Sequence, residues 1–316
     1  MSEESRLQLR SKDNEFALAL SKGVQALAAR GLRDATALEG VDARGRVDAT
    51  LLSLHAEAES EEHRSGGIAF LREPWVDLLN VETVQRDAEK GDARCQVVVA
   101  FRYMIGNRDL NETVHWVRKA ADQGYPPAWF LLAWMYDNPC LGVPDVGQDL
   151  NEAASWYRKA AEQGYAPAQF NLGVMYDMGE GVTLDHTEAT KWYRNAAHQG
   201  LNEAQFNLGL KYDHGQGVPR NPGAAAMWYG YAALDGSARA QFNLGLKYAT
   251  GDGVKQQSLV FAYVWVSLAA PRANEAGGKR YLGVRDRVAA RMSPAEVADA
   301  QRLASDWEQW RASQEV

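Results

Sequence analysis

The stretch AQFNLG at residues 168–173 recurs unchanged at residues 204–209 and 240–245, with a step of 36 residues each time. Two looser copies begin earlier, at Cys95 and Ala128. Counted from each start, offset 4 is always aliphatic, offset 5 is always alanine or glycine, and offset 8 is always tyrosine. Because offsets 0, 4, 5 and 8 share one face of an α-helix, the pattern predicts the buried stripe of the first helix in a repeated unit.

A tryptophan marks a second helix in each unit, and an Ala-Ala pair begins four residues after it. Large and small residues one turn apart suit interdigitated helix packing. The tryptophans are Trp116, Trp156, Trp192, Trp228 and Trp265. Polar residues predict where four of these helices begin, and glycines predict where they end. The starts are Asp109, Asp149, Asp185 and Asn221, the last followed by Pro222, and the ends are Gly124, Gly164, Gly200 and Gly236.

Together these motifs resemble the Sel-1-like repeat family, a relative of the tetratricopeptide repeat. The pattern A-x-x-x-L-G-x-x-Y, G-x-G-V, A-x-x-W-Y and A-A-x-x-G is met most fully in the third and fourth units, as at residues 179–182 and 189–193. The resemblance implies an all-α, right-handed α/α solenoid of helix-turn-helix repeats, similar to the tetratricopeptide superhelix. It also implies an interaction scaffold rather than an enzyme.

The repeat region is expected to cover residues 77–270, with five clear units and a degraded leading one. In the leading unit, Ala88 to Gly91 mirrors Ala161 to Gly164, so residues 77–90 are interpreted as a second helix. Residues 271–316 are expected to form two amphipathic helices that close the open end of the stack, as terminal caps do. The second of them is predicted to start at Ser293, Pro294 and Glu296.

The N-terminal segment, residues 1–76, is less readable. Residues 14–30 and 46–62 each show a helical apolar face. Extra caps, a dimerisation arm and a separate helical domain all remain open for this segment.

Composition argues against several classes of function. The net charge of −7 and the pI near 5.5 disfavour a nucleic-acid partner, because such proteins are normally basic. The charged N-terminus lacks the apolar run of a signal peptide. The sequence contains no stretch of about 18 apolar residues, so membrane insertion is not predicted. The two cysteines, Cys95 and Cys140, do not suggest a disulfide framework. These features favour a cytoplasmic protein.

No catalytic residue, metal site or cofactor is predicted. Three G-x-G loops join helix to helix and recur with the repeat, so turn geometry accounts for them better than phosphate binding does. The six histidines share no repeat position, and neither an H-x-x-x-H nor a C-x-x-C pair occurs. Cys140 has no histidine at a recognisable motif spacing and Cys95 stands at an alanine position of the repeat, so nucleophilic catalysis lacks support.

One polar constellation predicts a binding surface. Asparagine stands at offset 3 of three first helices, and in two of them lysine follows one helical turn later, on the same face. The predicted partner-binding residues of a concave groove are Asn171, Asn207, Asn243, Lys211 and Lys247, with Arg102 in the first unit. Asparagine can bond a peptide backbone and lysine a carboxylate, so the expected partner is a protein segment, acidic or C-terminal. The alternative is that these asparagines satisfy loop carbonyls and the lysines are solvated.

The leading functional interpretation is therefore a non-catalytic adaptor that binds a partner protein segment. An immunity or antitoxin-like protein that sequesters one target is an alternative. Some secreted members of the family carry a cysteine pair in each repeat and have been labelled β-lactamase-like. This chain lacks those cysteines, so a hydrolase is a third, disfavoured interpretation.

Overall fold

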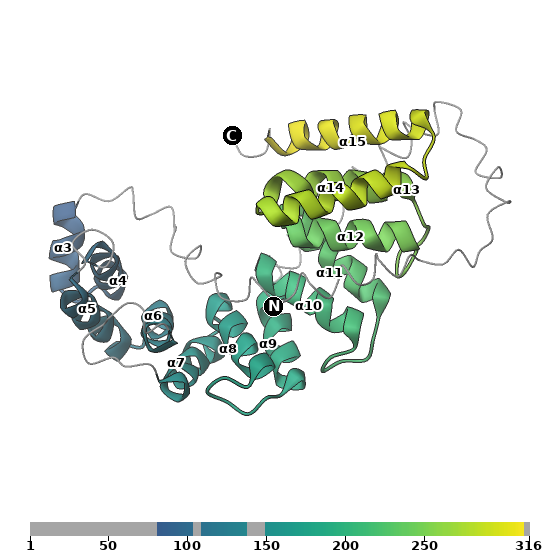
Figure 1. Ribbon diagram of the computed structural model, residues 1–316. Coiled ribbons are helices and arrows are strands. Elements are labelled where there is room, and N and C mark those ends of the chain that lie inside the picture. The colour runs from purple at the N-terminus through teal and green to yellow at the C-terminus, as the bar shows by residue number, and fades with distance from the viewer. Residues whose placement is uncertain (1–80, 104–108, 138–148, 313–316) are drawn as a thin grey trace. The chain divides into compact units, whose positions relative to one another are not determined.

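The computed structural model describes residues 81–103, 109–137 and 149–312. Within those ranges the chain forms helices joined by turns and no strand (Figure 1). The all-α repeat solenoid predicted from the sequence is confirmed. The helices predicted over residues 14–30 and 46–62, and the loop that holds Cys140, lie outside the described residues.

Each repeat is a pair of helices. The first helices are α4 (Ala93–Arg102), α6 (Pro126–Asp137), α8 (Ala166–Met178), α10 (Asn202–His214) and α12 (Ala238–Thr250). The second helices are α5 (Leu110–Asp122), α7 (Leu150–Glu162), α9 (His186–His198), α11 (Pro222–Leu234) and α13 (Leu259–Ala269). Helix α3 (Val81–Glu89) precedes the pairs, and η5 (Ala270–Arg272), α14 (Glu275–Ala289) and α15 (Pro294–Ala312) follow them.

The chain divides into two compact units, and each is described by itself. The N-terminal unit holds Arg64–Ala204 and Gln216–Val218, and the C-terminal unit includes Gln205–Gly215 and Pro219–Val316. The boundary falls inside α10, so the repeats before and after it belong to different units.

The predicted starts and ends of the second helices are observed. The side chains of Asp109, Asp149 and Asp185 accept hydrogen bonds from the backbone N–H groups of Glu112, Glu152 and Glu188, and Asn221 accepts one from Ala224. These bonds satisfy amides that a helix start would otherwise leave unpaired. Past the helix ends, Gly124, Gly164, Gly200 and Gly236 have φ between 79° and 93°, where glycine is unstrained.

The predicted first-helix stripe forms the core. Ala168 and Leu172 on α8 are fully buried. Next to them, Gly173 faces the ring of Tyr193, and a Cβ at Gly173 would lie only 2.8 Å from that ring. Gly209 and Tyr229 repeat this contact in the C-terminal unit at 2.7 Å. The small residue at offset 5 is therefore needed because an aromatic ring packs directly on the helix backbone.

A glutamine at offset 1 ties consecutive helix pairs together. In the N-terminal unit, the side-chain amide of Gln169 donates to the carbonyl of Ala161 at 3.0 Å, and Gln241 bonds Ala233 in the C-terminal unit at the same distance. Gln96 makes this bond to Ala88 in α3, also at 3.0 Å. Helix α3 therefore relates to α4 as α7 relates to α8.

The C-terminal helices α14 and α15 both pack on α13. Tyr281 of α14 stacks on Phe242 with ring centroids 4.2 Å apart, and Trp307 of α15 meets Trp265 edge to face at 5.9 Å. Helix α15 begins with Ser293 and Glu296 in a reciprocal capping box. Near its other end, Arg311 donates to the carbonyl of Asp235 at 2.9 Å. These contacts cover the apolar face of α13, which is what a terminal cap requires.

Candidate functional site

The predicted site residue Asn171 is half-buried on α8 and is held by a tyrosine. Its side-chain N–H donates to the hydroxyl of Tyr157 on α7 at 2.9 Å. Burial raises the pKa of Tyr157 well above its ordinary value, and the charge of Asp137 raises it further, so the phenol stays protonated. Tyr157 therefore accepts from Asn171 while its own proton points toward the carboxylate of Asp137, 3.5 Å away.

This tyrosine–aspartate pair recurs in three repeats and was not among the features predicted from the sequence. The hydroxyls of Tyr157, Tyr193 and Tyr229 lie 3.4–3.5 Å from the carboxylates of Asp137, Asp177 and Asp213. The signal that could have revealed it is the dipeptide Tyr-Asp, which stands near the end of the first helix in the same three repeats whose second helix carries Trp-Tyr. The polar positions of the first helices are therefore linked to the second helices by hydrogen bonds that are partly or fully buried.

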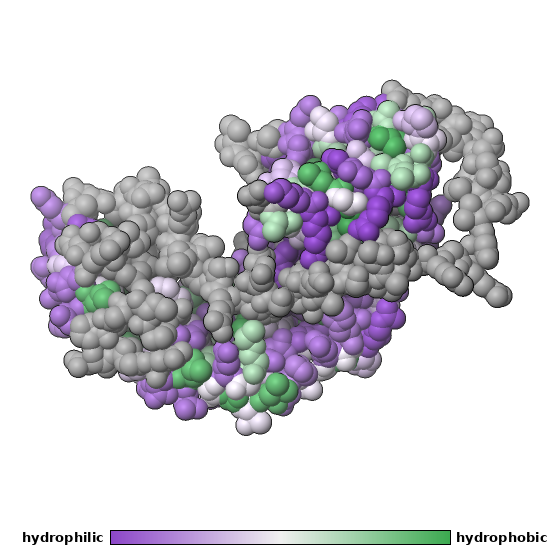
Figure 2. Space-filling view, in the orientation of Figure 1, coloured by the Kyte–Doolittle hydropathy of each residue, from purple (hydrophilic) through white to green (hydrophobic). Residues whose placement is uncertain are grey.

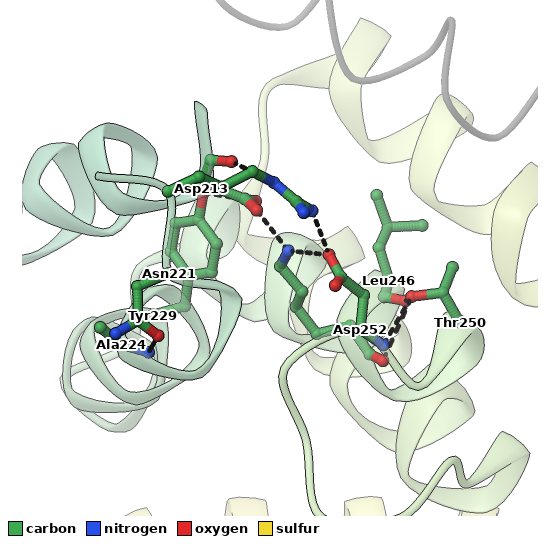
Figure 3. A network of polar contacts seen from close by, with 9 residues as sticks. Asp213, Asn221, Ala224, Tyr229, Leu246, Thr250 and Asp252 are labelled. Atoms are coloured by element: carbon green, nitrogen blue, oxygen red, sulfur yellow. Dashed lines mark hydrogen bonds and ion pairs between the residues drawn. The ribbon is translucent and has the colours of Figure 1, made fainter. Parts of the chain in front are cut away.

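Lys247, predicted to face a partner, is paired inside the C-terminal unit with Asp213 and Asp252, which are labelled in Figure 3. Its ammonium bonds the carboxylate of Asp213 on α10 and lies 2.8 Å from that of Asp252, in the turn after α12. The side chains of Lys247 and Asp213 are only 8% and 6% exposed, so each charge depends on the other for compensation.

Arg220 completes this cluster on its exposed side. Its guanidinium donates to Asp252 at 2.9 Å and, through Nε, to the backbone carbonyl of Asp213 at 3.0 Å. Two cations thus face two carboxylates, and the cluster formed by Asp213, Arg220, Lys247 and Asp252 has no net formal charge.

The remaining predicted positions differ in exposure. Asn207, Lys211 and Asn243 are buried, at 7%, 5% and 7% exposure, whereas Arg102 at the end of α4 is exposed. Asn207 and Lys211 lie on α10 with Asn243 and Lys247 on α12, all in the C-terminal unit, while Asn171 and Arg102 belong to the N-terminal unit. The six predicted partner-binding residues therefore fall in two units, which are described separately.

The Sel1 repeat family model matches the chain five times, at residues 93–125, 129–165, 166–201, 202–237 and 238–270. This chain belongs to the Sel1 repeat family. The matched segments are the five helix pairs described above, and they confirm the resemblance found in the sequence.

Two solved Sel1-type structures are similar to this chain. A protective antigen of uropathogenic Escherichia coli with an SLR fold is 30% identical, with a TM-score of 0.63 over 74% of this chain and 50% of its own. A Sel1 repeat protein from Oxalobacter formigenes is 35% identical, with a TM-score of 0.56 over 64% of this chain and 57% of its own. The chain thus spans about half the length of these relatives. No curated protein matches it.

The G-x-G loops of these Sel1 repeats have a packing role. The second glycines, Gly181, Gly217 and Gly253, have φ of 66–82°, and a Cβ on any of them would overlap a backbone carbonyl at the start of the preceding repeat's second helix. Turn geometry and close backbone approach thus account for the motif.

Within the described residues, a metal site would require a group of ligating side chains and a membrane span would require a long apolar helix. No group of three or more histidine, cysteine, aspartate or glutamate side chains is placed to hold a metal ion there. None of the helices described is long and apolar enough to cross a membrane.

Proposed function

We propose that this Sel1 repeat chain is a non-catalytic scaffold that binds a segment of a partner protein through the polar positions of its first helices. Sel1 repeat proteins generally mediate protein–protein interaction, which supports the class of function. The predicted positions Asn171, Asn207, Asn243, Lys211, Lys247 and Arg102 remain the candidate surface. Lys247 contributes mainly by organising the two aspartates around it, because its ammonium is already bonded to them.

The observation that carries the proposal is the orientation of the Asn171 amide. Tyr157 holds one N–H of this half-buried side chain, and the described residues provide no donor to its carbonyl oxygen. An asparagine amide fixed in this way can accept from, and donate to, the backbone of an extended peptide. A fixed side chain also loses little rotamer freedom on binding, which favours affinity.

The character of the described surface also supports a polar mode of recognition. In the face shown in Figure 2, apolar residues form small separate patches among hydrophilic ones. The large apolar side chains that are exposed are Met178, Leu184, Met227 and Leu282, which belong to different helices and turns. Hydrogen bonds and charges therefore offer more for a partner to recognise than an apolar patch does.

An acidic or C-terminal partner segment remains a prediction, and Arg102 is its exposed basic position. Sequestration of one target remains the second candidate function, and β-lactamase-like hydrolysis the third. A cytoplasmic location is likewise proposed from the sequence alone.

Partner capture with matched variants tests the scaffold proposal. The full chain is immobilised, and proteins from the source cells are captured and quantified by mass spectrometry. We expect Asn171→Ala to lower the recovery of specific partners at least fivefold, whereas Met227→Ala, an exposed change on the second helix α11, leaves it unchanged. Both variants should keep the helical circular dichroism signal. Equal recovery by Asn171→Ala and the unchanged chain would show that this surface does not bind the partner.

A further inference from the structure

The cluster around Lys247 shows what one position of the repeat can bind. Two carboxylates, from Asp213 at the end of one first helix and Asp252 in the turn after the next, converge on a single ammonium (Figure 3). The lysine that supplies it stands directly before the repeat tyrosine Tyr248.

The N-terminal unit has the same positions with a different residue in the middle. Asp137 follows the repeat tyrosine of α6 as Asp213 follows that of α10, and Glu180 stands inside a G-x-G turn as Asp252 does. Between them in the register, Met175 takes the place of Lys247. The tyrosine contacts confirm this register, because Tyr157 lies 3.5 Å from Asp137 and Tyr229 lies 3.4 Å from Asp213.

The two carboxylates of the N-terminal unit have no internal counter-charge in the part of the chain that the structure describes. Asp137 is half-buried and its carboxylate meets a neutral phenol, while Met175 is 4% exposed and apolar. Burial raises the pKa of Asp137, and the negative charge of Glu180 raises it further. The intermediate repeat differs again, since Asp177 meets the ring of His186 at 2.6 Å.

We propose that Asp137 and Glu180 bind the ammonium group of a lysine side chain on a partner protein, in the position that Lys247 occupies between Asp213 and Asp252. The proposal rests on the scaffold function and names one contact within it. A lysine is favoured because an ammonium is the group that this pair of positions holds in the C-terminal unit. The thioether of Met175 offers the methylene stem of such a lysine an apolar and adaptable contact.

Transplanting the internal lysine tests the site without any partner. In the full chain, Met175→Lys should raise the melting temperature by about 2–4 °C, because the new ammonium meets two carboxylates. In the Asp137→Asn, Glu180→Gln background the same lysine is buried without a counter-charge and should lower the melting temperature. Equal effects of Met175→Lys in both backgrounds would overturn the proposal.

A free ammonium probe keeps the proposal testable if the lysine variant does not fold. Methionine methyl groups are labelled with carbon-13, and n-butylammonium chloride is titrated against sodium chloride at equal ionic strength. The Met175 methyl resonance should shift saturably with n-butylammonium only, and the exposed Met227 methyl should not. The Asp137→Asn, Glu180→Gln variant should lose the saturable shift. A Met175 resonance that ignores the probe, or responds equally in that variant, would overturn the site.

The outcomes for the site and for the scaffold can be told apart. If the probe fails at Met175 while Asn171→Ala still lowers partner recovery, the ammonium site is wrong and the scaffold stands. If the probe binds while Asn171→Ala has no effect on recovery, the ammonium site is correct and the Asn171 surface is wrong.

Discussion

The C-terminal and N-terminal units share a tyrosine-linked aspartate and an acidic residue in a G-x-G turn, but they differ in the residue that stands before the repeat tyrosine. In the C-terminal unit Lys247 bonds Asp213 and Asp252, and Arg220 also bonds Asp252, so the charges are satisfied within the chain. In the N-terminal unit the middle position is Met175, and the described residues supply no ammonium to Asp137 or Glu180. The residue at the lysine position therefore distinguishes a repeat whose buried aspartate is paired within the chain from one that leaves two carboxylates for another molecule.

The last repeat sharpens the comparison, since it lacks both members of the tyrosine–aspartate pair. Ala249 stands where the aspartate would be, and Val266 packs on Gly245 where a tyrosine ring packs in the two preceding repeats. The absence of both fits the chemistry of the pair, because the carboxylate without its hydroxyl partner would have one fewer hydrogen bond. The tyrosine and the aspartate therefore act as one structural unit in the three repeats that contain them.

Replacing Lys247 by methionine, which makes the C-terminal cluster resemble the N-terminal one, should have the largest effect on the free energy of unfolding. Lys247→Met leaves Asp213 buried beside Asp252 without the lysine ammonium. Removing one partner of a buried ion pair costs about 3–5 kcal/mol, and we expect a loss of that size in the free energy of unfolding in urea. Lys255→Met, at an exposed lysine, should stay within about 0.5 kcal/mol. Identical urea midpoints for the two variants would mean that the internal pair contributes nothing.

The next largest loss of stability should come from enlarging the glycine that packs against a tyrosine ring. The loss should be similar in both units, because both contain this contact. Gly209→Ala places a Cβ 2.7 Å from the ring of Tyr229 and should cost about 1–3 kcal/mol by overpacking. Gly173→Ala should behave alike in the N-terminal unit. The matched control is Gly230→Ala on α11, where a Cβ meets no atom within 4 Å, and it should stabilise by up to about 1 kcal/mol. Thermal melts compare the three, and a stabilising Gly209→Ala would contradict the packing.

The helix boundaries and the buried stripe that the two units share could be predicted from the sequence, because they depend on residues close together in the chain. Asp149 and Gly164 mark the start and end of a helix through bonds and φ angles that involve only neighbouring residues. The stripe of Leu172 and Gly173 follows from helical periodicity alone. The small residue there also anticipated the close approach of a neighbouring group, although not that this group is the ring of Tyr193.

What distinguishes the units could not be predicted in the same way. The pairing of Lys247 with Asp213 joins residues 34 apart, and it depends on how one repeat stacks on the next. A lysine on a helix face looks solvated or ligand-facing in the sequence, because nothing local reveals a carboxylate arriving from another repeat. Asn171 lies on the first helix α8, where the repeat pattern places it, but its bond to Tyr157 joins two helices and has no local signal in the sequence.

A smaller effect should come from breaking the tyrosine link in the N-terminal unit. Tyr157→Phe removes the hydroxyl that joins Asn171 to Asp137 and should lower the free energy of unfolding by about 1 kcal/mol, a typical net value for one intramolecular hydrogen bond. Because Asn171→Ala removes the same bond, the double variant should lose less than the sum of the single changes. A double-mutant cycle in urea measures this coupling, and strict additivity would mean that the two side chains do not interact.

The smallest expected effect is the pH dependence of stability that Asp137 causes. Its pKa is raised by burial and then by Glu180, so the folded chain binds this proton more tightly than the unfolded chain does. The unchanged protein should therefore lose stability relative to Asp137→Asn as the pH rises from about 4 through the raised pKa. The gap in melting temperature at pH 7 should be only about 2 °C, because the group is partly hydrated.

Asp92→Asn is the control of opposite sign for this pH dependence. A hydrogen bond from the backbone N–H of Cys95 lowers the pKa of Asp92, so there the unchanged protein should gain stability relative to Asp92→Asn as the pH rises from that lowered pKa to about 4. If the melting temperatures of Asp137→Asn and the unchanged chain vary with pH in the same way from about pH 4 to 8, the proposed electrostatic difference between the two units is wrong. If the gap appears, it measures the unpaired charge that a partner's ammonium would neutralise.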